Sequence, residues 1–325
     1  MPKVSIPYGR QSLTADIPEG RLLFSGETAS LPALDNLEDY LWRKLDNPIG
    51  CAPLKDLVAT GNRFLILVED NTRHTPVKRI LPVLLAYLEK AGVPLAKVEI
   101  LTAPGTHRVM TDAELEEKIG AEVLRKIKVI QHDFEDTSSL ADLGTIQVES
   151  SRIPVLINRK ALEANFIIGL GDIVPHCDAG FSGGAKILQP GICGYATTAA
   201  THVSAALLDQ IPLGDVNSPC RAGMEKVAGQ VNLRFIINTI KNCQNEVVEI
   251  VTGDFVAAHR AGVVVSKQSF GVNIPALADV VIVSSFPCDI DWWQGEKGLI
   301  SAFFAVKKGG VIICASPCPE GLEHN

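Results

Sequence analysis

The chain has 325 residues, more than one hydrophobic core usually supports, so its length predicts two domains. Its 37 acidic residues outnumber 30 basic ones, for a formal net charge of -7, which argues against a nucleic-acid partner. We expect no membrane association and a cytoplasmic location, because no apolar run approaches the roughly 20 residues of a membrane span and none of the eight cysteines forms a CxxC pair.

Strand-type and helix-type patterns alternate along the chain. Residues 64–68 form an apolar run, and residues 77–90 follow with helical spacing. A second run at 97–102 precedes a helix whose start, Thr111 to Glu114, has the pattern of a capping box. Further buried strands are expected at 128–131, 165–170 and 234–238. This order predicts an α/β fold with a mostly parallel sheet covered by helices.

A second α/β domain is expected to start near residue 271. A strand at 278–285, a helix at 298–308 and a strand at 310–315 would form one βαβ unit. We therefore assign residues 1–270 to an N-terminal domain and 271–325 to the start of a C-terminal domain. One such unit has fewer strands than a stable sheet normally has, so this second domain is expected to be incomplete in the chain.

Three polar residues follow predicted strand ends. Asp70, His107 and His176 each lie just past a strand, and ligands of parallel sheets bind at the carboxyl ends of the strands. We expect these three loops to converge on one crevice. The alternatives are that Asp70 or Thr72 caps the next helix and that His107 is an ordinary loop histidine.

The richest segment is 175–191, with the sequence PHCDAGFSGGAKILQPG. Its glycines allow close approach of the backbone to a bulky ligand, and free N–H groups in such a loop can hold a phosphate. His176 and Lys186 add reactive side chains, and His202 follows in a helix rich in small residues. The alternatives are a structural loop and a histidine satisfied in the core.

A last polar group lies at the start of the second domain. Gln294 and Lys297 are spaced to share one helix face, and two tryptophans precede them. Trp293 either contributes to a ligand site or fills an interdomain core.

Together these motifs resemble the lactate racemase family that depends on a nickel-pincer nucleotide, with its 2-hydroxy acid racemase and epimerase relatives. The resemblance extends from residue 70 to the end of the chain, and the long glycine–lysine motif is its most specific part. It rests on the following segments: Asp70-x-Thr72-Arg73-x-x-Pro76, Gly105-Thr106-His107-Arg108, 175–191, His202 and Gln294-x-x-Lys297.

The resemblance implies a cofactor, pyridinium-3,5-bisthiocarboxylic acid mononucleotide nickel, joined to Lys186 through a thioamide. His202 would be the protein ligand of the nickel, which agrees with the preference of nickel(II) for sulfur and imidazole ligands. The other residues implied in cofactor binding are Asp70, Thr72, Gln294 and Trp293, with Ser182, Gly183 and Gly184 as the phosphate cradle.

The resemblance also implies the reaction. His107 and His176 would be the acid–base pair of a proton-coupled hydride transfer, and Arg73 and Lys297 would hold the substrate carboxylate. The expected site lies in the cleft between the two domains, and the expected partners are a 2-hydroxy acid and cofactor maturation enzymes. Two alternatives remain open: an ordinary nicotinamide-dependent oxidoreductase, although no GxGxxG lies between a strand and a helix, and a relative that binds a nucleotide or metal without turnover.

Overall fold

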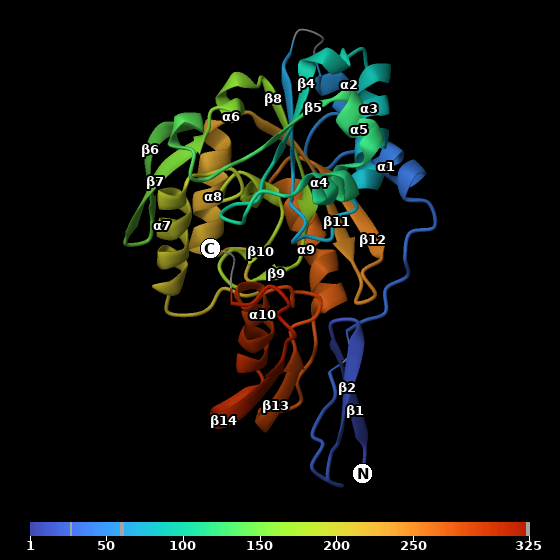
Figure 1. The fold of residues 1–325 in the computed structure, drawn as a ribbon, viewed down its shortest axis with the longest axis vertical. Helices are drawn as coiled ribbons and strands as arrows, with labels where there is room; N and C mark the ends of the chain where they lie inside the picture. Colours follow the sequence, from blue (N-terminus) through green and yellow to red (C-terminus); the bar gives the residue numbers. More distant parts are fainter. Residues whose placement is uncertain (27, 59–61, 323–325) are drawn as a thin grey trace. The chain divides into compact units, whose positions relative to one another are not determined.

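The chain is described by a computed structural model covering residues 1–26, 28–58 and 62–322 (Figure 1). It forms two units: residues 30–270 make the larger one, and residues 1–29 with 271–325 make the smaller one. The sequence-based boundary was also drawn at residue 270, but residues 1–29 group with the second segment. The reason is bonding between residues far apart in the sequence, since Ser284 Oγ donates to Pro7 O (2.6 Å) and Gly9 N donates to Asp289 Oδ2 (3.0 Å).

A six-stranded sheet forms the centre of the larger unit. Its strands are, in spatial order, β12 (Val247–Gly253), β11 (Leu233–Lys241), β8 (Phe166–Asp172), β3 (Phe64–Val68), β4 (Val98–Thr102) and β5 (Lys128–Gln131). Strand β12 runs antiparallel to β11, and the other neighbouring strands are parallel. The five strands expected in this part of the sequence are confirmed, and so is the mostly parallel sheet.

Strand β3 shows why these runs are apolar throughout. Leu65 and Leu67 enter the core on one face of the sheet, whereas Phe64, Ile66 and Val68 enter the core on the other face. Both faces are covered, so alternate side chains are buried on opposite sides and no polar alternation remains.

Helices cover both faces of this sheet. The core that contains Phe64 also receives residues of α1 (Leu37–Asp46), α2 (Leu54–Leu57), α3 (Val77–Lys90), α4 (Asp112–Ile119) and α5 (Ala121–Lys126). The opposite core receives residues of β6 (Leu140–Val148), β7 (Ser151–Asn158), α6 (Lys160–Glu163), α7 (Tyr195–Ala206), α8 (Pro219–Gln230) and α9 (Ala257–Phe270). Helix α3 matches the predicted 77–90, and Thr111 and Glu114 form the predicted capping box of α4.

Short elements complete the larger unit. Two of them, β9 (Pro175–His176) and β10 (Gly180–Phe181), pair within the glycine–lysine segment, which continues into the 3-10 helix η3 (Gly184–Ile187). Two further 3-10 helices are η1 (Leu95–Lys97) and η2 (Thr137–Ser139).

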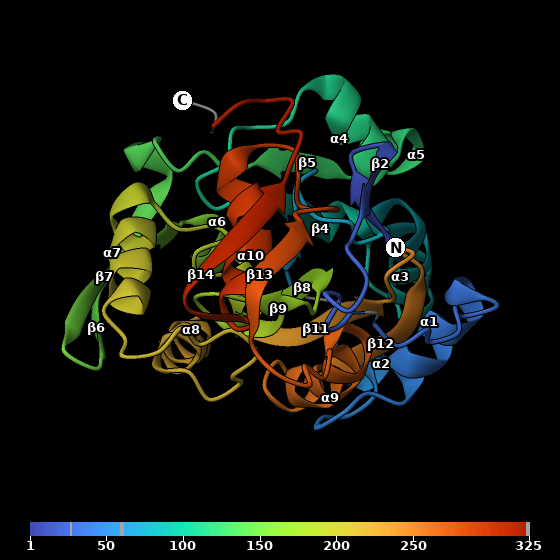
Figure 2. The same ribbon diagram turned by 90° about the horizontal axis from the view of Figure 1, so that it is seen from below.

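The smaller unit contains a hairpin of β1 (Lys3–Tyr8) and β2 (Gln11–Asp16) and a βαβ unit of β13 (Ala278–Ser284), α10 (Trp292–Phe303) and β14 (Val306–Ala315) (Figure 2). Strands β13 and β14 are parallel, as predicted. The predicted helix 298–308 is misplaced. It begins at Trp292 because the Asp291 side chain accepts the N–H of Gln294 (2.6 Å) and caps it, and it ends at Phe303 because β14 starts at Val306.

The order of the strands defines a switch point in the large sheet. From β3 the chain adds β4 and β5 on one side and then returns to place β8 on the other side. Ligands of such sheets bind beyond the carboxyl ends of the strands at this point. Asp70 comes two residues after the end of β3, and Asp172 is the last residue of β8. Among the described residues, no helix is long and apolar enough to cross a membrane.

Candidate active site

Two of the three predicted loops meet beyond the sheet edge. Asp70 Oδ2 lies 2.7 Å from His107 Nδ1, so the loop after β3 is joined to the loop after β4. The Thr72 hydroxyl donates to Asp70 Oδ1 (2.7 Å) and lies 3.3 Å from the same His107 nitrogen. Neither Asp70 nor Thr72 caps α3, whose N-cap is Pro76. The structure therefore uses these side chains in one polar cluster, and the capping alternative is wrong.

The Asp70 carboxylate is strongly stabilised in its ionised form. Burial alone would raise its pKa, but the charge and hydrogen bond of His107, the charge of Arg73 and the Thr72 hydroxyl together outweigh burial and lower the pKa to about 2. Arg73 donates to the Thr72 hydroxyl oxygen (3.0 Å), which places its guanidinium beside this cluster. At neutral pH, Asp70 is thus a fixed negative charge that can only accept hydrogen bonds.

Under this loop lies a buried charge cluster that the sequence analysis missed. It consists of Glu69, Lys118, Asp172 and Lys241, all less than a tenth exposed. Lys241 Nζ lies 3.1 Å from Asp172 Oδ2, and Lys118 Nζ donates to the carbonyl oxygen of Arg73 (2.6 Å). Buried charges are stable only when they are paired in this way. Through Lys118, this cluster fixes the backbone of Arg73.

The two acids of this cluster differ in proton affinity. Burial and the negative charge of Asp172 raise the pKa of Glu69 to about 7, although Lys118, the Thr75 hydroxyl and Arg73 act in the opposite direction. Burial also acts on Asp172, but Lys241, Arg73 and Lys118 hold the pKa of that carboxyl below its usual value. Asp172 is therefore the ionised partner of Lys241, while Glu69, which accepts from the Thr75 hydroxyl (2.6 Å), takes up a proton near neutral pH.

The glycine–lysine loop, residues 175–191, is held mainly through its backbone. Arg221 donates to the carbonyl oxygens of Phe181 and Gly183, the latter at 2.9 Å. Asn238 Oδ1 accepts from Gly184 N (2.8 Å). These bonds fix the turn immediately before Lys186, and the sequence analysis missed both anchoring side chains.

A third anchor is His259, whose Nε2 lies 2.9 Å from the carbonyl oxygen of Ser182. Burial lowers the pKa of His259 well below its usual value, so its neutral ring donates this bond. Burial also lowers the pKa of Arg221, to about 10. Arg221 is still a cation at neutral pH.

Ser182, Gly183 and Gly184 form a tightly enclosed turn. Ser182 donates its N–H to Val174 O (2.8 Å) and its hydroxyl to Asp172 O (2.8 Å). Gly183 has a φ of 73°, and a Cβ there would lie 2.8 Å from both Asn238 Oδ1 and Asp172 O. Only glycine fits this position. The assignment of these three residues to a phosphate cradle stays a prediction, and two of their N–H groups already donate within the fold.

His176 and His202 flank one carboxylate. Asp178 Oδ2 lies 3.9 Å from His176 Nδ1 and 3.9 Å from His202 Nε2. The side chain of His202 is 36% exposed, which excludes the alternative of a core histidine. Burial lowers the pKa of His202, the charge of Asp178 opposes this, and the charges of Lys186 and His107 lower it further. Through Asp178, His176 and His202 lie on either side of one negative charge.

Donor atoms of His176, Cys177 and Asp178 lie within 4.8 Å of one another, close enough to surround a cation. However, His176 Nδ1 already accepts the backbone N–H of Asp178 (3.2 Å), so its lone pair is in use. Using this trio as a metal site would therefore require the His176 ring to give up that hydrogen bond.

The remaining predicted residues belong to the smaller unit. Lys297 Nζ donates to Gln294 Oε1 within α10, which confirms that the two side chains share a helix face. Gln294 is buried, whereas Trp293 is 47% exposed. A site in the cleft between the two units, with these residues facing Asp70 and His107, stays a prediction.

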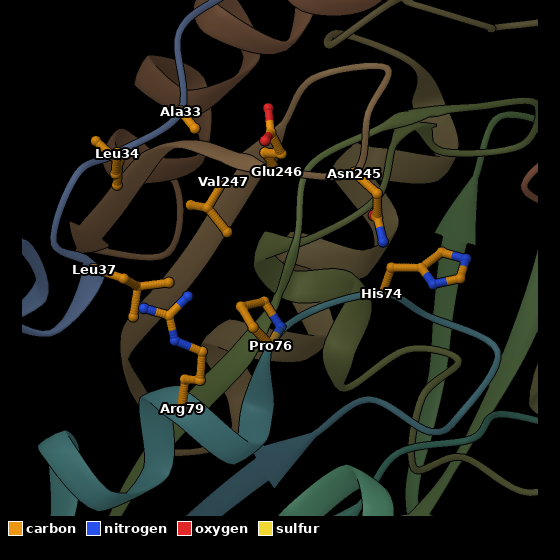
Figure 3. A pocket seen from close by; sticks show the side chains of 9 residues that line it. All are labelled: Ala33, Leu34, Leu37, His74, Pro76, Arg79, Asn245, Glu246 and Val247. Carbon is orange, nitrogen blue, oxygen red and sulfur yellow. The ribbon is translucent and has the colours of Figure 1, made fainter.

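A cavity of about 340 Å³ lies elsewhere in the larger unit (Figure 3). It is lined by segments 33–37, 74–79 and 245–247, and its lining includes His74 but none of the predicted site residues. Its Arg79 is bound by Glu38 through two hydrogen bonds of 2.9 and 3.0 Å. The cavity is therefore distinct from the candidate active site.

Proteins similar to this chain over nearly its whole length are known. Residues 8–211 match the lactate racemase N-terminal domain family. The lactate racemase of Thermoanaerobacterium thermosaccharolyticum is 33% identical over 99% of this chain and 76% of its own length. This chain belongs to the lactate racemase family. The lactate racemase of Lactiplantibacillus plantarum is 31% identical over all of this chain and 78% of its own length.

Solved structures support the same placement. The lactate racemase apoprotein of T. thermosaccharolyticum matches with a TM-score of 0.87 and 31% identity, over all of this chain and 76% of that one. A protein from Thermotoga maritima matches with a TM-score of 0.64 and 26% identity, over 78% of this chain and 65% of that one. Membership in the lactate racemase family makes this chain an isomerase with a mixed α/β fold.

Proposed function

We propose that this lactate racemase family member inverts the configuration at C2 of a 2-hydroxy acid, with lactate as the first candidate. The observation that carries the proposal is the 2.7 Å pair of Asp70 and His107 at the switch point, together with His176 and His202 on either side of Asp178. A carboxylate-oriented imidazole is a typical acid–base group, and the nearby Arg73 suits a substrate carboxylate.

The chemistry explains why such a site needs a cofactor. Direct removal of the C2 proton from a hydroxy carboxylate would create a dianion, which no ordinary side-chain base supports near neutral pH. A nickel-pincer nucleotide, when bound, supplies a hydride acceptor that avoids this dianion. The donor set fits the group, because the amine of Lys186 can form the covalent link and the imidazole of His202 is a nitrogen ligand suited to nickel.

The protein's own residues then bind, orient and move protons. Arg73 and Lys297 would hold the substrate carboxylate, with Asp70 and Thr72 orienting His107. His107 and His176 would exchange the hydroxyl proton on the two faces of the substrate. Gln294 and Trp293 would close the site from the smaller unit, which would exclude water and retain a 2-oxo acid between half-reactions. Loading of the nucleotide would require maturation enzymes as partners.

The test is intact-protein mass spectrometry with metal analysis on protein produced together with cofactor maturation enzymes. We expect an adduct of nucleotide mass and nickel near one per chain, both lost in Lys186→Ala and both kept in Lys226→Ala, which removes an exposed lysine of α8. An unmodified mass without nickel, while a control racemase is loaded in the same cells, would favour an ordinary oxidoreductase or a binding protein.

Racemase assays on the loaded protein test the acid–base pair. Each of His107→Ala and His176→Ala should reduce the rate by about 100-fold or more, the usual contribution of a general acid–base group. Full activity in either variant would remove that histidine from the proposed mechanism.

A further inference from the structure

The two histidines of the proposed acid–base pair have different partners on the same ring nitrogen. A neutral imidazole carries one proton, so one ring nitrogen donates and the other accepts. A partner whose role is fixed, either as pure donor or as pure acceptor, therefore determines which nitrogen carries the proton.

The partner of His107 Nδ1 is a pure acceptor. Asp70 Oδ2 lies 2.7 Å away, and the lowered pKa of Asp70, about 2, keeps this carboxylate ionised. Thr72 does not compete as a donor, because its hydroxyl proton is directed to Asp70 Oδ1 at 2.7 Å and its oxygen accepts from Arg73. The proton of neutral His107 therefore lies on Nδ1, and Nε2 presents a lone pair.

The partner of His176 Nδ1 is a pure donor. The backbone N–H of Asp178 lies 3.2 Å away, and a backbone N–H can only donate. The Asp178 carboxylate, at 3.9 Å, is beyond hydrogen-bonding distance from this nitrogen, and the Cys177 thiol at 4.0 Å is a further potential donor. The proton of neutral His176 therefore lies on Nε2.

We infer that His107 and His176 rest in opposite tautomers, His107 with an unprotonated Nε2 and His176 with a protonated Nε2, and that the backbone of Asp178 is the positioning group that sets the second one. The functional consequence rests on the proposed function. In the resting enzyme, His107 is the group that accepts the substrate hydroxyl proton, and His176 is the group that donates a hydrogen bond to a substrate oxygen.

The experiment is a long-range proton–nitrogen correlation spectrum of the whole chain labelled with ¹⁵N-histidine, recorded without cofactor at a pH where an ordinary imidazole is neutral. Protonated and unprotonated ring nitrogens have well-separated ¹⁵N chemical shifts. The chain has seven histidines, so few signals need to be assigned. Signals are assigned with His107→Gln and His176→Gln. We expect His107 with a protonated Nδ1 and His176 with a protonated Nε2.

The variant Asp70→Asn sharpens the result. An asparagine offers both an acceptor and a donor, so His107 should lose its tautomer preference while His176 keeps its own. The matched control Asp209→Asn removes an exposed carboxylate and should change neither signal. If Asp70→Asn does not fold, the wild-type spectrum alone decides.

The same tautomer on both histidines, or a protonated Nε2 on His107, would overturn the inference. The spectrum requires no cofactor and no turnover, so its result tests the tautomers independently of the proposed function. Opposite tautomers in a chain that shows no racemase activity after loading would retain the inference about the histidines and reject the proposed reaction.

Discussion

The loop after β3 and the glycine–lysine loop lie at the same edge of the sheet, but they are held by different forces. The first carries Asp70 and Arg73 and lies on the buried charge cluster, where opposite charges balance one another. The second is fixed by bonds to its own backbone from Arg221, Asn238 and His259. The first loop therefore depends on the charges beneath it, whereas the second depends on hydrogen bonds to its backbone and on a turn that admits only glycine at position 183.

The largest expected effect tests the buried charge cluster. Lys241→Met leaves Asp172 as a buried charge without its nearest partner, so we expect a loss of about 3–5 kcal/mol in the free energy of unfolding. Denaturant titration measures this loss. The double variant Lys241→Met/Asp172→Leu removes both charges and should recover part of it. A single variant within about 1 kcal/mol of wild type would show that the pair does not hold this loop.

The glycine–lysine loop should respond to added volume. Gly183→Ala introduces a Cβ about 2.8 Å from two oxygen atoms at a φ of 73°, so we expect a loss of about 2–4 kcal/mol. Gly144→Ala is the matched control, because Gly144 has a φ of 85° but nothing within 4 Å of its added Cβ. Its loss should be only about 1 kcal/mol. Equal losses of stability in the two variants would show that backbone strain, and not the crowding around Gly183, causes the effect.

Glu69 provides a pH test that applies only to the first loop. Its folded-state pKa is raised to about 7 from a value near 4.5, so its protonated form stabilises the fold fully below about pH 4.5. This stabilisation is lost as the pH rises through 7. The stability of wild type relative to Glu69→Gln should therefore fall by on the order of 2–3 kcal/mol between pH 4.5 and 8.

The measurement is chemical unfolding of both proteins across this pH range. Gly183→Ala, compared with wild type in the same way, should show a difference that does not change with pH. A pH-independent difference between wild type and Glu69→Gln would mean that Glu69 is ionised throughout.

The smallest expected effect is at the surface. Arg79 and Glu38 form a hydrogen-bonded pair whose side chains are 55% and 45% exposed. Solvent screens such pairs, so Arg79→Gln should cost less than about 1 kcal/mol. Thermal unfolding of Arg79→Gln and Lys241→Met compares the two losses of stability. A similar loss in both variants would show that burial does not make the Lys241–Asp172 pair more important than the Arg79–Glu38 pair.

Much of the sheet could be predicted from the sequence because its strands are buried on both faces. A run such as residues 64–68 is apolar at every position, which is a strong signal. The hairpin of β6 and β7 was not predicted, since its burial pattern is irregular and a register shift interrupts it near Gly144. The N-terminal hairpin was assigned to the wrong unit because its bonds reach across about 280 residues.

The candidate site divides in the same way. Asp70 and His107 could be predicted because both lie just beyond strand ends, where ligands of parallel sheets bind. Arg221 and His259 could not, because they bind backbone carbonyls 38 to 77 residues away, and backbone atoms leave no trace in a sequence pattern. Glu69 was visible as an acid ending a buried strand, which is a signal that could have indicated a buried charge.

The division of the chain has a consequence for synthesis on the ribosome. Residues 30–270 are contiguous and can fold as soon as they emerge, whereas residues 1–29 belong to a unit whose other segment begins at residue 271. The hairpin of β1 and β2 is synthesised before the larger unit, but its bonds to Ser284 and Asp289 can form only after about 240 further residues have been added. During that interval the hairpin lacks the bonds that fix it to its own unit, so its strand edges are open to pairing with other chains.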